Sequence, residues 1–160
     1  MGLFHTRYKI RLNIKVEKMK TIFVKPAEVE RNWYVIDAKD VTLGKVAVKA
    51  AMLLRGKHKA CYTPHQEVGD YVIIINADKA ALSANKKKDK MYYEHSGFMG
   101  GLKAYNYETL MTKRPTAPME KAVKGMLSSG PLANQLFRNL KVYVGDTHPH
   151  TAQQPIAVEV

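Results

Sequence analysis

The residues best suited to chemistry form a polar loop between Gly56 and Gly69, just before the most apolar run of the chain. Cations in this loop stand beside an aromatic ring, a proline and two histidines. Positive side chains bind phosphates, and rings stack on bases or riboses, so the loop is a candidate RNA contact. The alternative is a solvated surface loop, which charge runs often form. Its candidate residues, with the arginine before it, are Arg55, Lys57, His58, Lys59, Tyr62 and His65.

The strongest charge run of the chain, Lys86-Lys87-Lys88-Asp89-Lys90, introduces a second candidate contact. It is followed by an extended segment from Met91 to His95 and by a glycine-rich loop from Ser96 to Lys103. Glycine lets a backbone approach phosphates closely. The loop has neither the Walker spacing nor the dinucleotide-binding GxGxxG spacing, so a plain turn is the alternative. The lysines and aromatic residues that flank it favour a nucleic-acid contact.

Histidines could also be read as metal ligands, since His58, His65, His148 and His150 occur with Asp70 in this chain. None of them has the spacing of the paired histidines in a metalloprotease helix. A Gly-x-Ser-x-Gly nucleophile elbow is also absent from the sequence. A metal-dependent hydrolase is therefore the disfavoured alternative. We expect no catalytic residue, metal, cofactor or small-molecule substrate.

The composition points to a folded, basic protein. The 160 residues are 46% apolar, and 26 Lys and Arg against 14 Asp and Glu give a net charge of +12. This excess favours a polyanionic partner, nucleic acid before an acidic membrane surface, although charge also serves solubility. A single cysteine, Cys61, excludes an internal disulfide and is expected to be a small buried apolar residue. No apolar run approaches the roughly 20 residues of a membrane span, so we expect a cytoplasmic protein.

Two buried strands and a helix must position the first loop. The apolar run within Gly69 to Ala77 does not alternate with polar residues, which predicts a strand covered on both faces, as in a parallel sheet. Trp33 to Ala38 predicts the first core strand. Thr42 is expected to cap a helix whose apolar stripe runs to Leu54, and Gly56 is expected to end it. Together these elements predict a βαβ unit with a right-handed crossover.

The rest of the chain predicts further helices and one more strand. Residues 119–127 carry an apolar face that includes Met119 and Met126, which we expect in the core. A second short helix is expected over 132–140 and a final strand over 141–145. Within residues 1–18, apolar and polar side chains alternate from Tyr8 to Glu17, as in a strand. Residues 1–18 are either a basic arm or an upstream reading artefact. The remainder, residues 19–160, is expected to form a single domain.

Several motifs carry a resemblance to a known family. In chain order they are Trp33-Tyr34-Val35-Ile36-Asp37-Ala38, Leu43-Gly44, Leu53-Leu54-Arg55-Gly56-Lys57-His58-Lys59, Tyr62-Thr63-Pro64-His65, Gly69-Asp70-Tyr71-Val72, His95-Ser96-Gly97, Gly100-Gly101-Leu102-Lys103 and His148-Pro149-His150. In this order, and over about residues 19–155, the chain resembles the L-thirteen family of large-subunit ribosomal proteins in its bacterial form. It departs from the family pattern at Lys45, where arginine is usual, and at Phe98 and Met99, where tyrosine and proline are usual.

The resemblance implies a three-layer α/β/α sandwich around a mainly parallel four-stranded sheet. It also implies a structural role in the large ribosomal subunit, with large-subunit rRNA and neighbouring ribosomal proteins as partners, no membrane, and early entry into subunit assembly. An RNA-binding translational regulator, with messenger RNA as a partner, is the alternative. By position, the resemblance places RNA contacts between Arg55 and His65, between Lys86 and Lys103, and near His148 to Gln154.

We expect the basic, ring-bearing turns to share one open positive surface on a rigid sheet. Besides the residues of the first loop, the predicted RNA-binding residues are Lys45, Lys49, Lys86, Lys87, Lys88, Lys90, Tyr92, Tyr93, His95, Ser96, Gly97, Phe98, Gly100, Gly101, Lys103, Lys124, Arg138, Lys141, His148, His150, Gln153 and Gln154.

Overall fold

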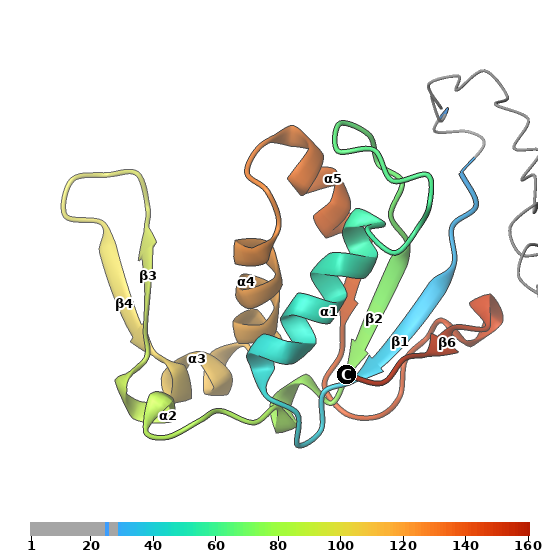
Figure 1. Cartoon of the computed structure of the whole chain (residues 1–160). Coiled ribbons are helices and arrows are strands. Elements are labelled where there is room, and N and C mark those ends of the chain that lie inside the picture. Colours follow the sequence, from blue (N-terminus) through green and yellow to red (C-terminus); the bar gives the residue numbers. More distant parts are fainter. Residues whose placement is uncertain (1–24, 26–28) are drawn as a thin grey trace, which may run out of the picture.

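A parallel sheet forms the centre of the molecule (Figure 1). The computed structural model describes Lys25 and residues 29–160, so the predictions made for residues 1–18 lie outside the described residues. Its four strands are β1 (Trp33–Asp37), β2 (Tyr71–Ile75), β5 (Leu140–Val142) and β6 (Ile156–Ala157). They lie in the order β5-β2-β1-β6, and every neighbouring pair is parallel. Helices flank this sheet, which confirms the predicted α/β sandwich.

The apolar run predicted as the central strand is β2. Val72, Ile73 and Ile74 are fully buried, because β2 has neighbours on both edges and cover on both faces. Val72 and Ile74 belong to the cluster packed beneath the helices, and alternation along the strand turns Ile73 to the other face. Strand β1 pairs with β2 in register from Trp33 opposite Tyr71 to Asp37 opposite Ile75. The run without a polar face was therefore correctly predicted as doubly covered.

Helix α1 (Leu43–Arg55) connects these two strands and ends as predicted. Gly56 takes a left-handed conformation (φ 71°), and its N–H donates to the carbonyls of Leu53 and Met52. The prediction of a side-chain cap at Thr42 is wrong, because that side chain makes no capping hydrogen bond. The Thr42 carbonyl instead accepts the amides of Lys45 and Val46, and the Leu43 amide donates to Ala81.

Two further helices complete the layer on α1. Helix α4 (Ala117–Met126) packs beside α1, and α5 (Pro131–Arg138) contacts both α1 and β5. Met119 is fully buried, as predicted. The prediction that Met126 lies in the core is wrong, because this residue at the end of α4 is 40% exposed. Cys61 is only half-buried, so the prediction that it is a small buried apolar residue is wrong. It lies in the turn-rich loop between α1 and β2, outside the buried core cluster.

A hairpin extends away from this body (Figure 1). It consists of β3 (Met91–His95) and β4 (Leu102–Asn106), preceded by the short helix α2 (Lys86–Asp89) and followed by α3 (Tyr107–Lys113). Helix α3 joins the hairpin to the body by packing against α4. Short 3-10 turns occur at Ala77–Lys79 and Thr151–Gln153. Within the described part of the chain, no helix has the length and apolar character needed to cross a membrane.

The prediction that residues 141–145 form the last strand is wrong in two respects: the strand ends earlier, and another strand follows it. Strand β5 stops at Val142, and Gly145 then adopts a left-handed conformation (φ 87°) that turns the chain. The amides of Asn76 and Ala77 donate to Gly145 and Tyr143, which fixes this turn against the end of β2. The chain returns afterwards to add β6 beside β1, a strand too short to show a period in the sequence.

Candidate nucleic-acid interface

A buried carboxylate holds the first loop in place. The Asp70 side chain is completely buried directly before β2. Its Oδ1 accepts the Lys59 ammonium at 2.6 Å and the Asn32 amide at 2.8 Å, while His58 Nε2 lies 2.8 Å from Oδ2. Gly69 is required beside it, because a Cβ there would lie 1.6 Å from the Leu54 carbonyl oxygen. The loop is thus pinned to both the sheet and α1.

Two of the predicted RNA ligands in this loop, Lys59 and His58, are held by protein contacts, and Lys59 faces inward. The Lys59 ammonium also donates to the carbonyls of Glu30 and Val68, at 2.7 and 3.1 Å, and its side chain is only 14% exposed. The His58 ring is 31% exposed and meets the Tyr34 ring edge-on, with 5.9 Å between centroids. Both residues therefore hold the loop in position. Direct contact with RNA is then expected from the neighbouring residues of the loop.

A half-buried pair at this loop combines a cation with a ring. Arg55 Nη2 donates to the Tyr62 hydroxyl at 3.2 Å, which joins the end of α1 to the middle of the loop. Lys57 and His65 are exposed on the same loop. A guanidinium held against a phenol in this way presents charge and a flat surface together, as phosphate and base contacts require.

The predicted histidines near residue 150 lie in a cluster of rings. The Tyr143 hydroxyl and His150 Nε2 are 2.7 Å apart, and His150 packs on Trp33 with 5.1 Å between centroids. Trp33 in turn stacks on Tyr71 at 4.5 Å. His148 is 6.5 Å from His150, measured between ring centroids. Gln153 and Gln154 follow this ring cluster in the chain and are exposed, so their side-chain amides are at the surface.

These two groups lie near the start of β1 but on opposite faces of the sheet. His58 contacts Tyr34 and His150 contacts Trp33, and these two neighbours in the strand point to opposite faces. Sequence reasoning missed Trp33, Tyr34 and Tyr143 as supports of the site. It considered Asp70 only as an imagined metal ligand. The sequence feature that could have indicated the supporting role of Asp70 is its position, between a basic loop and a fully apolar strand.

One face of the hairpin is linked to α4 by an ion pair. Glu94 accepts the Lys121 ammonium at 2.5 Å, and Lys121 and Lys90 lie 5.5 and 5.3 Å from the centroid of the Tyr92 ring. The hydrogen bond and charge of Lys121 lower the pKa of Glu94, whereas burial raises the pKa of Tyr92. Lys113 lies over Tyr105 on the neighbouring strand at 4.7 Å.

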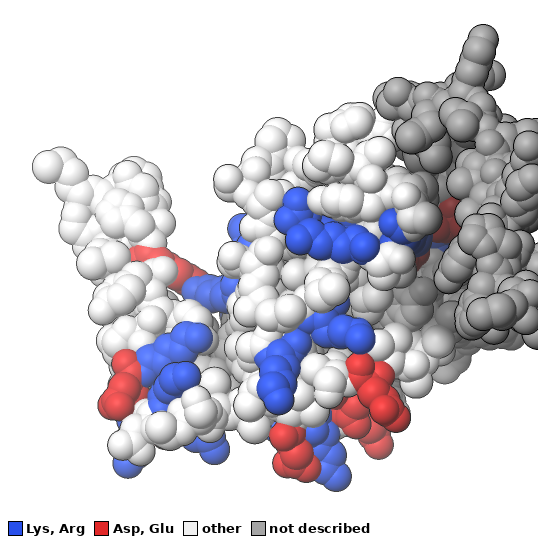
Figure 2. Space-filling view, viewed as in Figure 1, with Lys and Arg blue, Asp and Glu red and all other residues white. Residues whose placement is uncertain are grey.

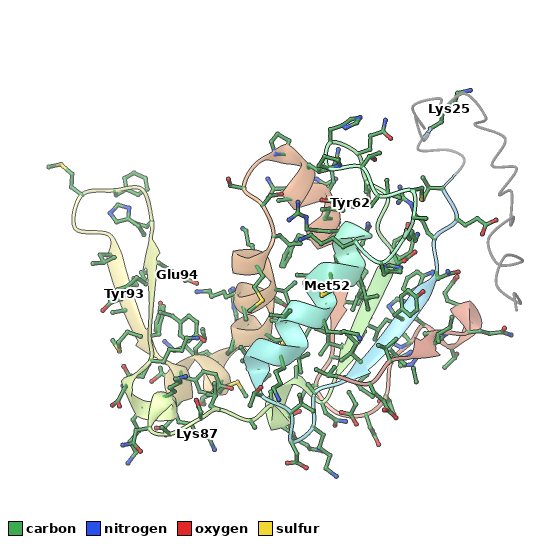
Figure 3. The ribbon with its side chains drawn as sticks, in the orientation of Figure 1. Lys25, Met52, Tyr62, Lys87, Tyr93 and Glu94 are labelled. Atoms are coloured by element: carbon green, nitrogen blue, oxygen red, sulfur yellow. The ribbon has the colours of Figure 1, made fainter. Side chains whose placement is uncertain are left out.

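The other face of the hairpin is exposed and uncharged. Tyr93 is 63% exposed and Leu102 is 62% exposed, and His95 lies opposite Leu102 in the register. Figure 3 shows Tyr93 and Glu94 on opposite sides of β3, as alternation along a strand requires. Ala104, opposite Tyr93, completes this face. The surface that the hairpin offers to a partner is therefore apolar and aromatic.

The tip of the hairpin is a tight, hydrogen-bonded turn. The Ser96 amide donates to the Gly101 carbonyl at 3.1 Å, and the Gly101 amide donates to the Phe98 carbonyl at 2.9 Å. Gly97 and Gly100 have positive φ (90° and 71°), which side chains disfavour. The turn projects Phe98 and Met99, which are 79% and 103% exposed. The glycines predicted as phosphate-approaching residues thus shape an apolar tip.

The remaining predicted cations are spread over the helices and the hairpin base. Figure 2 shows Lys and Arg side chains over the central helices and beside the hairpin, whose tip carries none on this face. Lys86 donates to the Ser83 hydroxyl at 2.9 Å, and Lys124 lies 5.9 Å from the Phe137 ring. The exposed members of this set are Lys45, Lys86, Lys87, Lys88, Lys90, Lys103, Lys124 and Arg138, and Lys49 and Lys141 are half-buried.

The predicted residues do not form one patch. The first loop and the His148–Gln154 segment lie near the start of β1 on opposite faces of the sheet, whereas the hairpin stands apart on the far side of α4 (Figure 1). The expectation of a single shared surface is therefore wrong. Sequence order could not show this separation, because it depends on how α3 and α4 pack after the hairpin.

The fold and these surfaces define a small α/β protein that displays basic and aromatic turns. Residues 31–149 match the family model described as Ribosomal protein L13. The chain is 59% identical over 142 residues to Large ribosomal subunit protein uL13 of Treponema denticola, covering 89% of this chain and 100% of that protein. It is 55% identical over 142 residues to the protein of the same name from Streptomyces griseus, covering 89% and 97%.

The chain belongs to the ribosomal protein L13 family. This is a family of ribosomal proteins and not an enzyme family. The match includes the first loop, the hairpin and His148, and thus most of the surfaces described above.

Proposed function

We propose that this chain is a structural constituent of the large ribosomal subunit that binds large-subunit rRNA and acts early in subunit assembly. The observation that carries the proposal is the 59% identity, over 142 residues, to a protein named for the large subunit. The net charge of +12 supports it independently, since rRNA is a polyanion. Its partners are then rRNA and the neighbouring proteins of the same particle, and its location is the ribosome.

The proposed mechanism begins with the exposed cations. Lys57 on the first loop, the lysines of α2 and Arg138 on α5 are open to solvent. Each lysine or arginine that neutralises an rRNA phosphate releases a counterion, which favours binding at low salt. Lys59 and His58 act indirectly, because their contacts with Asp70 hold the loop rigid before RNA arrives. A rigid loop loses less conformational entropy when it binds.

The rings supply the second part of the mechanism. Tyr62 beside Arg55, the His148–His150 pair and the exposed hairpin face offer flat or apolar surfaces to bases and riboses. Such contacts select unpaired, splayed nucleotides more than regular helices. Because the loop and the hairpin lie apart, one RNA molecule must contact the protein at two places. This arrangement would join separate rRNA segments and suits a protein that acts early in assembly.

The lysines of α2 provide the experiment. We expect Lys87→Ala with Lys88→Ala to reduce the slope of log affinity against log salt by about 1 to 2, since each lost phosphate contact removes roughly 0.7–0.9. Binding of a large-subunit rRNA transcript is measured at several salt concentrations. The matched control is Lys39→Ala with Lys79→Ala, which removes the same charge from exposed positions outside the predicted set. Equal slopes for the two variants would remove α2 from the proposed interface.

A second measurement tests the role in the particle. Cell lysate is separated on a sucrose gradient, and the chain is expected to migrate with large subunits and with their early precursors. Migration with the small subunit, or with neither subunit, would contradict the proposal.

A further inference from the structure

We propose that the groove between α1 and α4 docks an amphipathic segment of a neighbouring protein, with apolar side chains in the groove and acidic residues at its rim. This inference rests on the proposed place of the chain in the large subunit. Its apolar floor consists of residues that the RNA-binding prediction does not include, above all Val48, Met52 and Met126, whereas its rim is formed by four of the predicted cations.

The floor of the groove is apolar and open. Val48, Met52, Met126 and Val160 are 50%, 45%, 40% and 43% exposed, and they line a hollow of about 440 Å³. Met52 lies on the outer side of α1, away from the sheet (Figure 3). Apolar side chains gathered in one hollow mark binding surfaces more often than scattered ones do. Methionine is suited to such a surface because its flexible thioether adapts to the partner.

A helix glycine leaves room for a partner beside this floor. Gly44 lies in the first turn of α1 and lines the groove. A Cβ at this position would meet nothing within 4 Å, so the packing of the chain does not require glycine there. Glycine is less favourable than alanine in a helix. Close approach of a partner backbone would explain why glycine stands at this position.

The charge of the rim selects the partner. The charged side chains that line this hollow and its continuation along α1 are Lys45, Lys49, Arg55 and Lys57, all of them cations. RNA could pair with the cations, but its polar groups would lose water against the apolar floor without gaining hydrogen bonds. An amphipathic protein segment fits both the apolar floor and the cationic rim, since its apolar side chains fill the groove and its acidic side chains pair with the rim cations. We therefore assign the groove to protein.

The test places a photoreactive amino acid at Met52 of the full chain and isolates assembled large subunits. Irradiation is expected to give a crosslink to one protein, through a peptide that contains acidic residues. The matched control carries the same photoreactive group at Lys87, where a crosslink to rRNA is expected. A crosslink from position 52 to rRNA alone, or none to any protein, would overturn the inference.

A blocking variant makes the test independent of the probe position. Gly44→Leu places a large side chain in open space at the groove, so folding and incorporation into large subunits should be unchanged. The protein crosslink from position 52 should then fall at least tenfold. An undiminished crosslink would show that the partner does not occupy the groove. If the chain never sediments with large subunits, the proposed function fails as well, whereas incorporation without the protein crosslink overturns this inference alone.

Discussion

At the scale of single residues, Asp70 makes the contacts that hold the first loop in place. Its buried carboxylate accepts hydrogen bonds from Lys59 and the Asn32 amide and pairs with His58, so two separate parts of the chain, at residue 32 and at residues 58–59, meet on one side chain. A buried charge of this kind persists only when it is paired and hydrogen-bonded. The consequence is a loop in which Arg55 and Tyr62 have a fixed base.

We predict that Asp70→Asn lowers the free energy of unfolding by about 3 kcal/mol, because it leaves the Lys59 ammonium largely buried without its counter-charge. Urea unfolding followed by circular dichroism measures the change. The control is Asp89→Asn, which alters net charge equally at an exposed position on α2 and should change stability by no more than about 0.5 kcal/mol. A similar small effect for both variants would refute the structural role of Asp70.

At the scale of elements, the hairpin separates two kinds of contact. Its inner face is anchored through Glu94 and Lys121, and its outer face and tip are uncharged. Contacts made by an uncharged tip release no counterions, so they add affinity that salt does not weaken. The tip can act in this way only while Ser96 and Gly101 keep their hydrogen-bonded turn.

We predict that Gly101→Ala distorts the tip without unfolding the protein. The added Cβ would lie 2.0 Å from Ser96 Oγ and 2.8 Å from the Phe98 carbonyl oxygen, so the backbone must shift. Amide hydrogen exchange at Ser96 and Gly101 should accelerate, while the melting temperature stays within about 2 °C. Gly125→Ala is the control, since its Cβ meets nothing within 4 Å and alanine favours the helix. Unaltered exchange at Ser96 would show that the turn tolerates a side chain.

At the scale of the whole molecule, the chain combines a dense sheet with an arm of low contact density. Ile73 and Ile74 are fully buried, whereas four of the five residues of β3 are exposed. Regions with few buried apolar contacts open locally at lower free energy than the core. This difference bears on the expectation that residues 19–160 form a single domain.

We predict that the amides of β3 exchange through openings that require at least about 2 kcal/mol less than those of β2. Native-state hydrogen exchange in the free protein measures both sets together. Binding of rRNA should slow exchange in the hairpin more than in the sheet. Equal opening free energies in the two regions would show instead that hairpin and sheet unfold as one unit.

The sequence predicted those parts of the fold that local pattern determines. The apolar run of β2, the stripe of α1 and the left-handed Gly56 were all correctly located, because each depends on neighbours within a few residues. The pairing of Asp70 with Lys59 and the addition of β6 to β1 depend on the tertiary fold, so no local sequence pattern predicts these contacts. The separation of the hairpin from the first loop was missed for the same reason.

The position of β6 also has a consequence for how the molecule is made. Residues 156–157 pair beside β1, which begins at Trp33, so strands from the two ends of the described chain are neighbours. A nascent polypeptide emerges from its first residue onward, so β1 is translated long before its outer neighbour exists. That edge of the sheet stays open during translation and closes only when synthesis has passed Ala157.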